Sequence, residues 1–139
     1  MAKLHLKIVS QEKKLLDTQV DEINAPASEG EVTLLPEHIP LFTKLAPGEL
    51  RYKQNGKEYS VVVSKGFLNI NDEGEVTVIV DSAFDARQLS LKQAQEAVKA
   101  AKESMKTAKD KKELIQAEAE LRFALLQEKI AQKTRRQKI

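Results

Sequence analysis

Apolar and polar residues alternate at the start of the chain. In KLHLKIVS, residues 3–10, the apolar residues Leu4, Leu6 and Ile8 are separated by single polar or charged residues. This is the period of a β-strand with one buried face and one solvated face. We therefore predict a strand here, with the side chain of His5 on the solvated face.

Two longer stretches each predict a β-hairpin. ELRYKQNGKEYSVVVSK, residues 49–65, holds Asn55-Gly56 between two strand-like runs, and this dipeptide suits the two positive-φ positions of a type I′ turn. FLNINDEGEVTVIV, residues 67–80, repeats the scheme around Asp-Glu-Gly. Shorter strands are expected near residues 15–25, 32–35 and 41–45. About eight to ten short strands of this kind predict a small antiparallel β-sandwich or barrel.

The apolar period changes from strand to helix at Leu91. Just before it, Ser90 and Gln93 have the spacing of a capping box, which marks the start of a helix. Apolar residues then follow a seven-residue repeat at positions 91, 94, 98, 101, 105 and 108. Several of these residues are alanine, so the predicted apolar stripe is narrow and lets a partner helix approach closely.

A second capping pair, Asp110 with Glu113, predicts a turn at residues 107–111 and a second helix to about residue 135. The two helices would form a hairpin. No glycine or proline enforces the turn, and each cap is worth only about 1 kcal/mol. A single extended helix over residues 90–135 is therefore an accessible alternative state.

The second predicted helix carries more apolar surface than one partner helix covers. Its two stripes are Leu114, Ala117, Leu121 and Leu125, and Ile115, Ala119, Phe123, Leu126 and Ile130. We expect one stripe to pack on the first helix and the other on the β-unit or on another protein. Between the stripes, Glu118 and Arg122 have the spacing and order of a helical ion pair.

Composition separates the same two parts of the chain. Residues 1–84 hold 9 Lys or Arg against 13 Asp or Glu, a net charge of −4, whereas residues 85–139 hold 14 against 8, a net charge of +6. All five glycines and all four prolines precede residue 75. We therefore predict an α+β protein, with an antiparallel β-sandwich domain over residues 1–84 and a two-helix hairpin over residues 85–139.

Several classes of function lack the residues they need. The chain contains no cysteine, and its two histidines are far apart in sequence, so no metal site is predicted. The phosphate-binding, zinc-protease and serine-nucleophile motifs are absent, which argues against an enzyme. Four Phe and two Tyr in no RNA-binding pattern, together with an acidic β-unit, argue against a nucleic-acid partner.

The sequence also lacks signals for membrane insertion and export. No run of about 18 or more apolar residues occurs. The first residues lack the apolar block of a signal peptide. We therefore expect no direct membrane insertion and a cytoplasmic location.

One long segment resembles a known family. SEGEVTLLPEHIPLFTKLAPGELRY, residues 28–52, looks like a loop of the ε subunits of F-type ATP synthases, whose usual form is close to GE(I/L)G(I/V)LPGHxPLLTxLxPGxLR. VVVSKGFLNI and EVTVIVDSA resemble two further strands of that family. The similarity covers essentially the whole chain. Thr33, Glu37 and Lys65 stand where the family usually has glycine.

The resemblance implies a non-catalytic rotor subunit of a proton-transporting ATP synthase, peripheral to the cytoplasmic face of the plasma membrane. In the family, the sandwich grips the γ subunit and stands on the c-ring. The helical hairpin either folds on the sandwich or extends to the catalytic α and β subunits, where it inhibits ATP hydrolysis. A free-standing ATP-sensing or adaptor protein of the same fold is the alternative.

The resemblance also implies contact residues. Those expected to face the c-ring are Glu29, Glu31, Glu37 and His38. Because Pro36 and Pro40 fix φ and remove backbone donors, we expect LPEHIP to be a rigid loop with an acidic, polar tip, and His38 to have no catalytic role. The basic residues expected to contact a β subunit from the extended hairpin are Arg122, Lys129, Lys133, Arg135 and Arg136.

Some bacterial members of the family bind ATP through a motif, (I/L)DxxRA, at the start of the first helix. Here it aligns with residues 89–94, where Ser90 replaces the aspartate and Gln93 the arginine. Loss of one charge-assisted contact to phosphate costs about 1.5–3 kcal/mol. We therefore predict no cofactor and at most weak regulatory binding of ATP. The candidate contacts are Ser90, Lys92, Gln93, Lys99 and Arg122.

Overall fold

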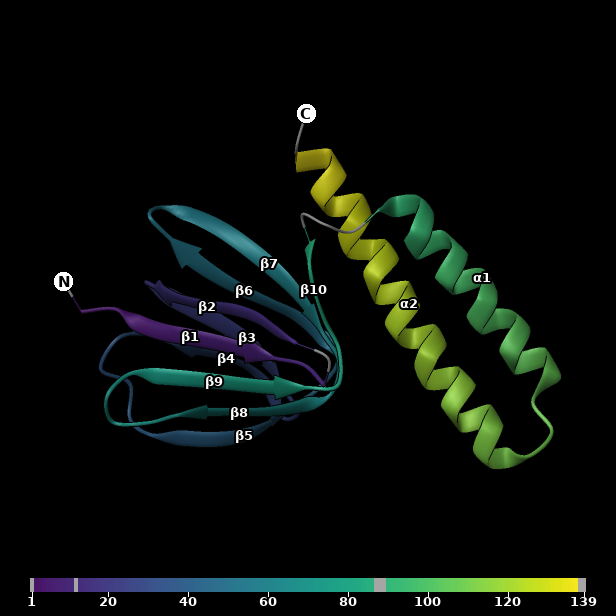
Figure 1. Ribbon diagram of the computed structural model, residues 1–139, viewed down its shortest axis with the longest axis horizontal. Coiled ribbons are helices and arrows are strands. Elements are labelled where there is room, and N and C mark those ends of the chain that lie inside the picture. Colours follow the sequence, from purple (N-terminus) through teal and green to yellow (C-terminus); the bar gives the residue numbers. More distant parts are fainter. Residues whose placement is uncertain (1, 12, 87–89, 138–139) are drawn as a thin grey trace. The chain divides into compact units, whose positions relative to one another are not determined.

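The computed structural model divides the chain into two compact units, Met1–Asp85 and Ala86–Ile139. It describes residues 2–11, 13–86 and 90–137, with side chains described as far as residue 133. The first unit is built of strands and the second of two helices (Figure 1). This order confirms the predicted α+β fold class.

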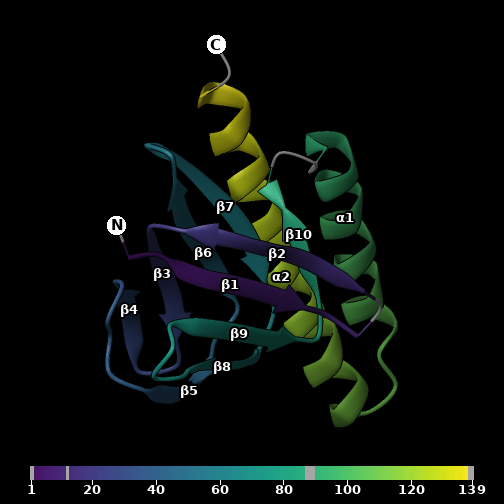
Figure 2. The same ribbon diagram turned by 60° about the vertical axis from the view of Figure 1, so that its left-hand side comes forward.

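The described part of the first unit contains ten strands. They are β1 (Leu4–Val9), β2 (Lys14–Val20), β3 (Glu22–Ala27), β4 (Gly30–Leu34), β5 (Leu41–Leu45), β6 (Gly48–Gln54), β7 (Lys57–Val63), β8 (Gly66–Ile70), β9 (Glu75–Val80) and β10 (Ala83–Asp85). Their order is β10-β7-β6-β3-β5-β8-β9-β1-β2, with β4 paired to β3. The sheet folds over where β3 meets β5, at Ala27 and Leu45, and so forms two layers (Figure 2).

One strand pairing departs from the predicted antiparallel arrangement. β1 runs parallel to β9, with His5 opposite Glu75 and Val9 opposite Ile79. Antiparallel neighbours joined by a tight turn can be predicted from local sequence. β1 and β9 are separated by most of the unit, so no local turn sets their relative direction.

The core lies between the two layers. It consists of those residues in each alternating strand whose side chains point inward. Leu4, Leu6 and Ile8 of β1 are fully buried, as their spacing predicts. Ile23 of β3 and Leu50 of β6 meet them from the other layer. Burying such a side chain stabilises the fold by about 1.5–3 kcal/mol. If a strand shifted its pairing by one residue, all of its buried apolar side chains would point to solvent. The core therefore fixes the strand register.

The two predicted hairpin turns are present. At the β6–β7 turn, Asn55 and Gly56 have φ values of 53° and 80°, which confirms that both adopt positive φ. At the β8–β9 turn, the Oδ1 atom of Asn71 accepts hydrogen bonds from the backbone N–H groups of Glu73 and Glu75, with N···O distances of 2.9 and 3.0 Å. These turns bring their flanking strands into antiparallel register.

Gly66 is required by the close approach of β8 to β9. A Cβ atom at this position would lie 2.1 Å from the carbonyl oxygen of Ile79 and 2.8 Å from the Cα atom of Val80. We expect Gly66→Ala to lower the free energy of unfolding by about 3 kcal/mol, because the two strands must separate to admit the methyl group. Urea denaturation followed by far-UV circular dichroism measures this loss.

Gly56→Ala is the matched control for that substitution. Gly56 has a positive φ, but open space surrounds the position of its missing Cβ. We expect a loss of only about 1 kcal/mol from backbone strain. Equal losses at the two positions would contradict the steric explanation for Gly66.

The second unit is a helical hairpin of α1 (Leu91–Thr107) and α2 (Lys111–Gln137). Ser90 is the N-cap of α1, and its hydroxyl oxygen accepts a hydrogen bond from the backbone N–H of Gln93 at 3.3 Å. The first capping box is therefore confirmed at its Ser90 side.

The second predicted cap also forms. The Oδ1 atom of Asp110 accepts from the backbone N–H of Glu113, and the Oε2 atom of Glu113 accepts from the backbone N–H of Lys109, both at 2.8 Å. In the usual capping box, the side chain of the third helical residue accepts from the backbone N–H of the N-cap residue. Here Glu113 accepts instead from Lys109, the residue before the N-cap Asp110. The turn lies between Thr107 and Lys111, as predicted.

Alanine forms the seam between the two helices. Ala94 and Ala101 on α1, and Ala117, Ala124 and Ala131 on α2, are 3–5% exposed. On each helix these residues repeat every seven positions, so they lie along one stripe. Their small side chains allow the two helices to pack closely.

The seam coincides with neither of the two stripes predicted on α2, one of which was expected to pack on the first helix. Leu114 and Leu125 of one stripe are 36 and 44% exposed and Ile115 of the other is 54% exposed, whereas Ala124, which belonged to neither stripe, is buried. Close helix packing selects small residues, so the bulkier leucines stand at the edge of the seam. Among the described residues, Glu118 and Arg122 form no ion pair, and that part of the prediction was wrong.

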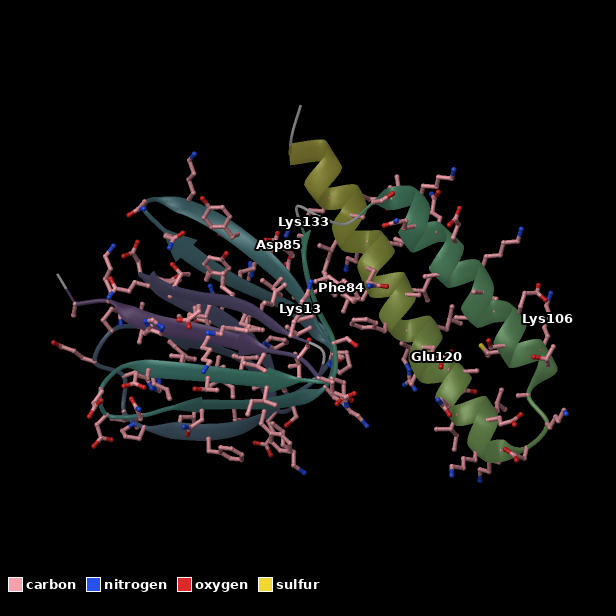
Figure 3. All side chains as sticks on the ribbon, viewed as in Figure 1. Lys13, Phe84, Asp85, Lys106, Glu120 and Lys133 are labelled. Atoms are coloured by element: carbon pink, nitrogen blue, oxygen red, sulfur yellow. The ribbon has the colours of Figure 1, made fainter. Side chains whose placement is uncertain are left out.

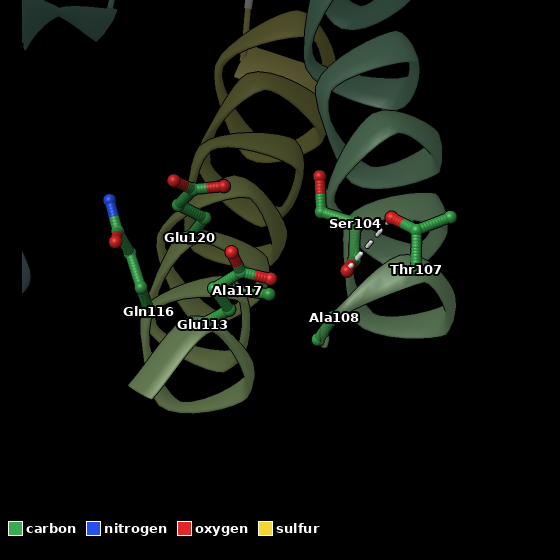
Figure 4. Close-up of a pocket in the computed structure, with 7 residues that line it drawn as sticks. All are labelled: Ser104, Thr107, Ala108, Glu113, Gln116, Ala117 and Glu120. Atoms are coloured by element: carbon green, nitrogen blue, oxygen red, sulfur yellow. Dashed lines mark hydrogen bonds between the residues drawn. The ribbon is translucent and has the colours of Figure 1, made fainter. Parts of the chain in front are cut away.

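Near the turn, the seam opens into a polar pocket of about 210 Å³ (Figure 4). Its lining residues are Ser104, Thr107, Ala108, Glu113, Gln116, Ala117 and Glu120. The hydroxyls of Ser104 and Thr107 donate to the backbone carbonyls of Ala100 and Glu103, at 3.2 and 3.3 Å. These two hydroxyls are therefore engaged by the backbone of α1.

Candidate functional site

The outer face of β5, β8, β9 and β1 carries apolar side chains among its polar ones. Strand register sets these side chains in two rows across the four strands. The first row is Lys44, Phe67, Ile79 and Val9, and the second is Phe42, Asn69, Thr77 and Lys7. We call the surface made by these residues the four-strand face.

Three large apolar side chains dominate the four-strand face. Phe42, Phe67 and Ile79 are 67, 44 and 57% exposed. The rings of Phe42 and Phe67 are stacked with their centroids 5.6 Å apart. These residues, with Asn69 and Thr77, line a shallow groove of about 430 Å³. A contiguous exposed apolar patch of this kind marks a surface for interaction with another protein.

The other layer presents a charged outer surface. Arg51 on β6 approaches the carboxylates of Glu31, Glu49 and Glu58, with N···O distances of 2.5, 4.0 and 4.0 Å. A carboxylate from each of three strands thus meets one guanidinium group. The two layers of the unit therefore offer chemically different outer surfaces.

The structure accommodates Thr33 and Glu37 at two positions where the resembled family usually has glycine. The hydroxyl of Thr33 donates to the Oδ1 atom of Asn24 across β4 and β3, at 2.6 Å. Glu37 has a φ of 70°, and the backbone N–H of His38 donates to the carbonyl of Leu35 at 3.1 Å. Positive φ at the third residue of a turn is where glycine is favoured. The turn forms here with glutamate in that place.

The segment between β4 and β5 also exposes apolar side chains. Leu35 and Ile39, which are 50 and 75% exposed, flank the polar residues Glu37 and His38. Leu35 directly precedes Pro36, and Ile39 lies between His38 and Pro40, in a segment that forms no strand. The Nδ1 atom of His38 lies 2.6 Å from the carbonyl oxygen of Ile39. No group of three or more described His, Asp or Glu residues could hold a metal ion.

The four residues expected at the c-ring do not form one cluster. Glu29 and Glu31 lie at the start of β4, whereas Glu37 and His38 follow its end. At about 3.3 Å per residue, the strand separates the two pairs by more than about 10 Å. The carboxylate of Glu31 is also engaged by Arg51. The predicted contact surface is therefore spread along an edge of the unit.

Beside the four-strand face, Asp17 on β2 contacts two basic side chains. It pairs with the imidazole of His5, and its Oδ2 atom lies 3.1 Å from Nζ of Lys14. The hydrogen bond from His5, then that from Lys14, holds the pKa of Asp17 below its ordinary value of 3.8. The ionised form is thus favoured in the folded state. Its stabilising effect is present above the ordinary pKa and is lost as the pH falls through the lowered one.

The hairpin does not gather the candidate ATP contacts. Lys92, Lys99 and Arg122 are exposed, and each is about 140–160° around its helix from the alanine seam. The hydroxyl of Ser90 already accepts the capping bond from Gln93. Position 89 of the aligned motif lies outside the described residues. Weak or absent ATP binding remains a prediction.

The residues expected to inhibit hydrolysis lie along α2 from Arg122, near its middle, towards its C-terminal end. Arg122 and Lys129 are exposed. The side chains of Arg135 and Arg136 lie outside the described set, although the helix continues to Gln137. On α1, Lys106 lies in the last turn (Figure 3) and pairs with Glu103 at 3.7 Å. None of the described helices has the length and apolarity needed to cross a membrane.

The outward apolar residues of the four-strand face were not predicted from the sequence. The signal that could have identified them is the presence of adjacent apolar residues where a half-buried strand alternates apolar with polar ones. Ile79 stands between the buried Val78 and Val80, and Phe67 precedes the buried Leu68. An apolar residue adjacent to an inward one must point outward in a strand. Such a residue identifies a surface that another molecule can cover.

Comparison with known proteins gives consistent matches. Residues 3–86 match the family model described as the ATP synthase Delta/Epsilon chain, beta-sandwich domain. The chain is 42% identical over 137 residues to an ATP synthase epsilon chain of Dehalococcoides mccartyi, covering 98% of this chain and 97% of that one. An epsilon chain of Nitratidesulfovibrio vulgaris is 46% identical over 94 residues, 68% of this chain and 69% of that one.

Solved structures agree at the level of the fold. A chain in the cryo-EM structure of the Euglena gracilis mitochondrial ATP synthase, which includes the c-ring, matches with a TM-score of 0.76 and 27% identity, covering 93% of this chain and 81% of that one. A chain of the Tetrahymena thermophila mitochondrial ATP synthase central stalk and c-ring has a TM-score of 0.65 and 14% identity, with coverages of 93 and 96%. This second likeness concerns the fold alone.

The family model spans more than half of the chain, and the Dehalococcoides relative aligns with nearly all of it, hairpin included. The chain therefore belongs to the ATP synthase epsilon chain family.

Proposed function

We propose that this subunit is a rotor element of the central stalk of a proton-transporting ATP synthase, seated on the γ subunit through the four-strand face. The observation that carries this proposal is the exposed, stacked pair of Phe42 and Phe67 beside Ile79. A stalk subunit must stay attached while torque passes through it. A central apolar patch supplies such attachment better than surface ion pairs, which are each worth about 0–1 kcal/mol.

We further propose that the β4 edge of the unit faces the c-ring at the cytoplasmic face of the plasma membrane. The turn at Glu37 and His38 and the hairpin end at Glu29 and Glu31 are exposed or half-buried. They combine carboxylates with the exposed side chain of Ile39. This chemistry suits the polar ends of membrane-embedded hairpins. In this role the subunit couples the catalytic head to the ring.

A cross-linker at residue 38 tests the c-ring contact. Because the natural chain has no cysteine, His38→Cys provides a single attachment point. We expect it to capture a c subunit in the assembled complex, while His38→Ala leaves the fold and γ binding intact. Lys57→Cys on the β6–β7 hairpin is the control and should capture none. Capture of α or β alone from residue 38 would contradict the assignment.

The hairpin is proposed to inhibit ATP hydrolysis in an extended state. Only Ala108, Lys109 and the capping residue Asp110 separate the two helices, and two caps worth about 1 kcal/mol each favour the break. The seam buries chiefly alanines, with Val98 of α1 as a larger member. The folded and extended states therefore differ by few interactions, and the basic residues of α2 can reach the α and β subunits.

Co-purification separates this proposal from a free-standing adaptor or ATP-sensing protein of the same fold. A tagged chain, isolated from detergent-solubilised membranes, should bring down γ and the c-ring in a constant ratio. A free-standing protein would elute alone. Recovery without γ and the c-ring at every protein concentration would sink the rotor assignment.

A further inference from the structure

Two lysines occupy opposite corners of the four-strand face. Lys44 ends the first row on β5, directly opposite Phe67 on β8. Lys7 ends the second row on β1, directly opposite Thr77 on β9. The apolar side chains lie between these corners. With strands about 4.8 Å apart, the two cations frame a patch roughly 14 Å across.

Neither lysine is neutralised within the part of the chain that the structure describes. No ion pair there includes Lys7 or Lys44, in contrast to Arg51 and Lys53 of the other layer, which pair with carboxylates. Asp17 stands opposite Lys7 in the β1–β2 register. Its two oxygens, however, are engaged by His5 and Lys14.

We infer that Lys7 and Lys44 are recognition residues for γ, and that γ presents carboxylates opposite both corners. This inference rests on the proposed function, which assigns the four-strand face to γ. Interfaces typically combine an apolar centre with a polar rim. Charges at such a rim direct encounter and fix orientation more than they add affinity. The two lysines therefore specify how the sandwich is turned on γ.

Association kinetics test the two lysines. The full-length chain is mixed with the ATP synthase head depleted of this subunit, and binding is followed at several salt concentrations. We expect Lys7→Gln/Lys44→Gln to lower the association rate constant about tenfold at low salt, with little change in the dissociation rate. The salt dependence should flatten, because the screened attraction is gone.

The matched control is Lys57→Gln/Lys109→Gln, which makes the same change in net charge on the β6–β7 hairpin and in the interhelical turn. It should retain most of the association rate. Equal slowing by both double variants would show that net charge alone acts and would overturn the inference.

A second comparison keeps this inference separate from the proposed function. Lys7→Glu/Lys44→Glu should slow association further than the glutamine variant, since repulsion replaces lost attraction. Faster association would show that γ carries positive rather than negative charge opposite these two positions, and would overturn the inference. Failure of the unaltered chain to bind the depleted head would instead contradict the proposed function, and the lysine assignment with it.

Discussion

Deletion of residues 108–139 is expected to raise ATP hydrolysis by the assembled complex roughly three- to tenfold, because it removes the helix that we propose holds the inhibited state. A contact between the basic end of α2 and a catalytic subunit is worth a few kcal/mol at most after desolvation. About 1.4 kcal/mol corresponds to a tenfold change in population. Steady-state ATPase assays on purified complexes measure the effect.

The control for the deletion retains the helix and changes its charge. Lys129→Gln/Lys133→Gln should give part of the activation, whereas Lys99→Gln/Lys106→Gln on α1 should give little. Assembly should survive the deletion, because the sandwich core is complete within the first unit. Hydrolysis at the unaltered rate after deletion would contradict the inhibitory role of α2.

Phe67→Asp is expected to weaken binding to γ at least about 100-fold. The substitution places a charge at the centre of the four-strand face, and loss of a central aromatic anchor costs about 2–4 kcal/mol. The fold should persist, because the Phe67 side chain is 44% exposed and does not belong to the core. Titration of labelled subunit with the depleted head measures the dissociation constant.

Ile39→Asp is the control for that substitution. It makes a similar change at a more exposed apolar residue on the β4–β5 segment, outside the four-strand face. We expect its affinity for γ to stay within about threefold of the unaltered chain, a difference below about 1 kcal/mol. Equal affinities for Phe67→Asp and the unaltered chain would remove the four-strand face from the γ interface.

The fold could be predicted where sequence rules are local. Alternation at Leu4, Leu6 and Ile8 gave a buried strand face, and Asn55-Gly56 gave a turn with two positive φ values. Ser90 and Asp110 gave both helix starts. In each case the determining interaction joins residues only a few positions apart.

Features that depend on distant partners could not be predicted. The parallel pairing of β1 with β9 depends on the closure of the whole sandwich. In α2, the hydrophobicity pattern predicted two stripes and neither contained Ala124, yet Ala124 is buried whereas Leu114 and Leu125 are 36 and 44% exposed.

The candidate site was predicted only in part for a similar reason. The resemblance supplied Glu29, Glu31, Glu37 and His38, yet the structure divides them between two ends of β4. It could not reveal that Glu31 meets Arg51 from β6, because that contact depends on the sheet order. The exposed aromatic residues Phe42 and Phe67 could not be distinguished from core residues, because the sequence alone does not show which face of each strand points inward.

Rotation of a probe attached to this chain tests the rotor assignment most directly. The natural chain has no cysteine, so Lys57→Cys on the exposed β6–β7 hairpin offers one attachment point. The complex is immobilised through its catalytic subunits, supplied with ATP, and observed with the probe on this chain or, as a control, on γ. We predict that both probes turn in the same direction and at the same rate. A stationary probe on this chain beside a rotating probe on γ would contradict the assignment.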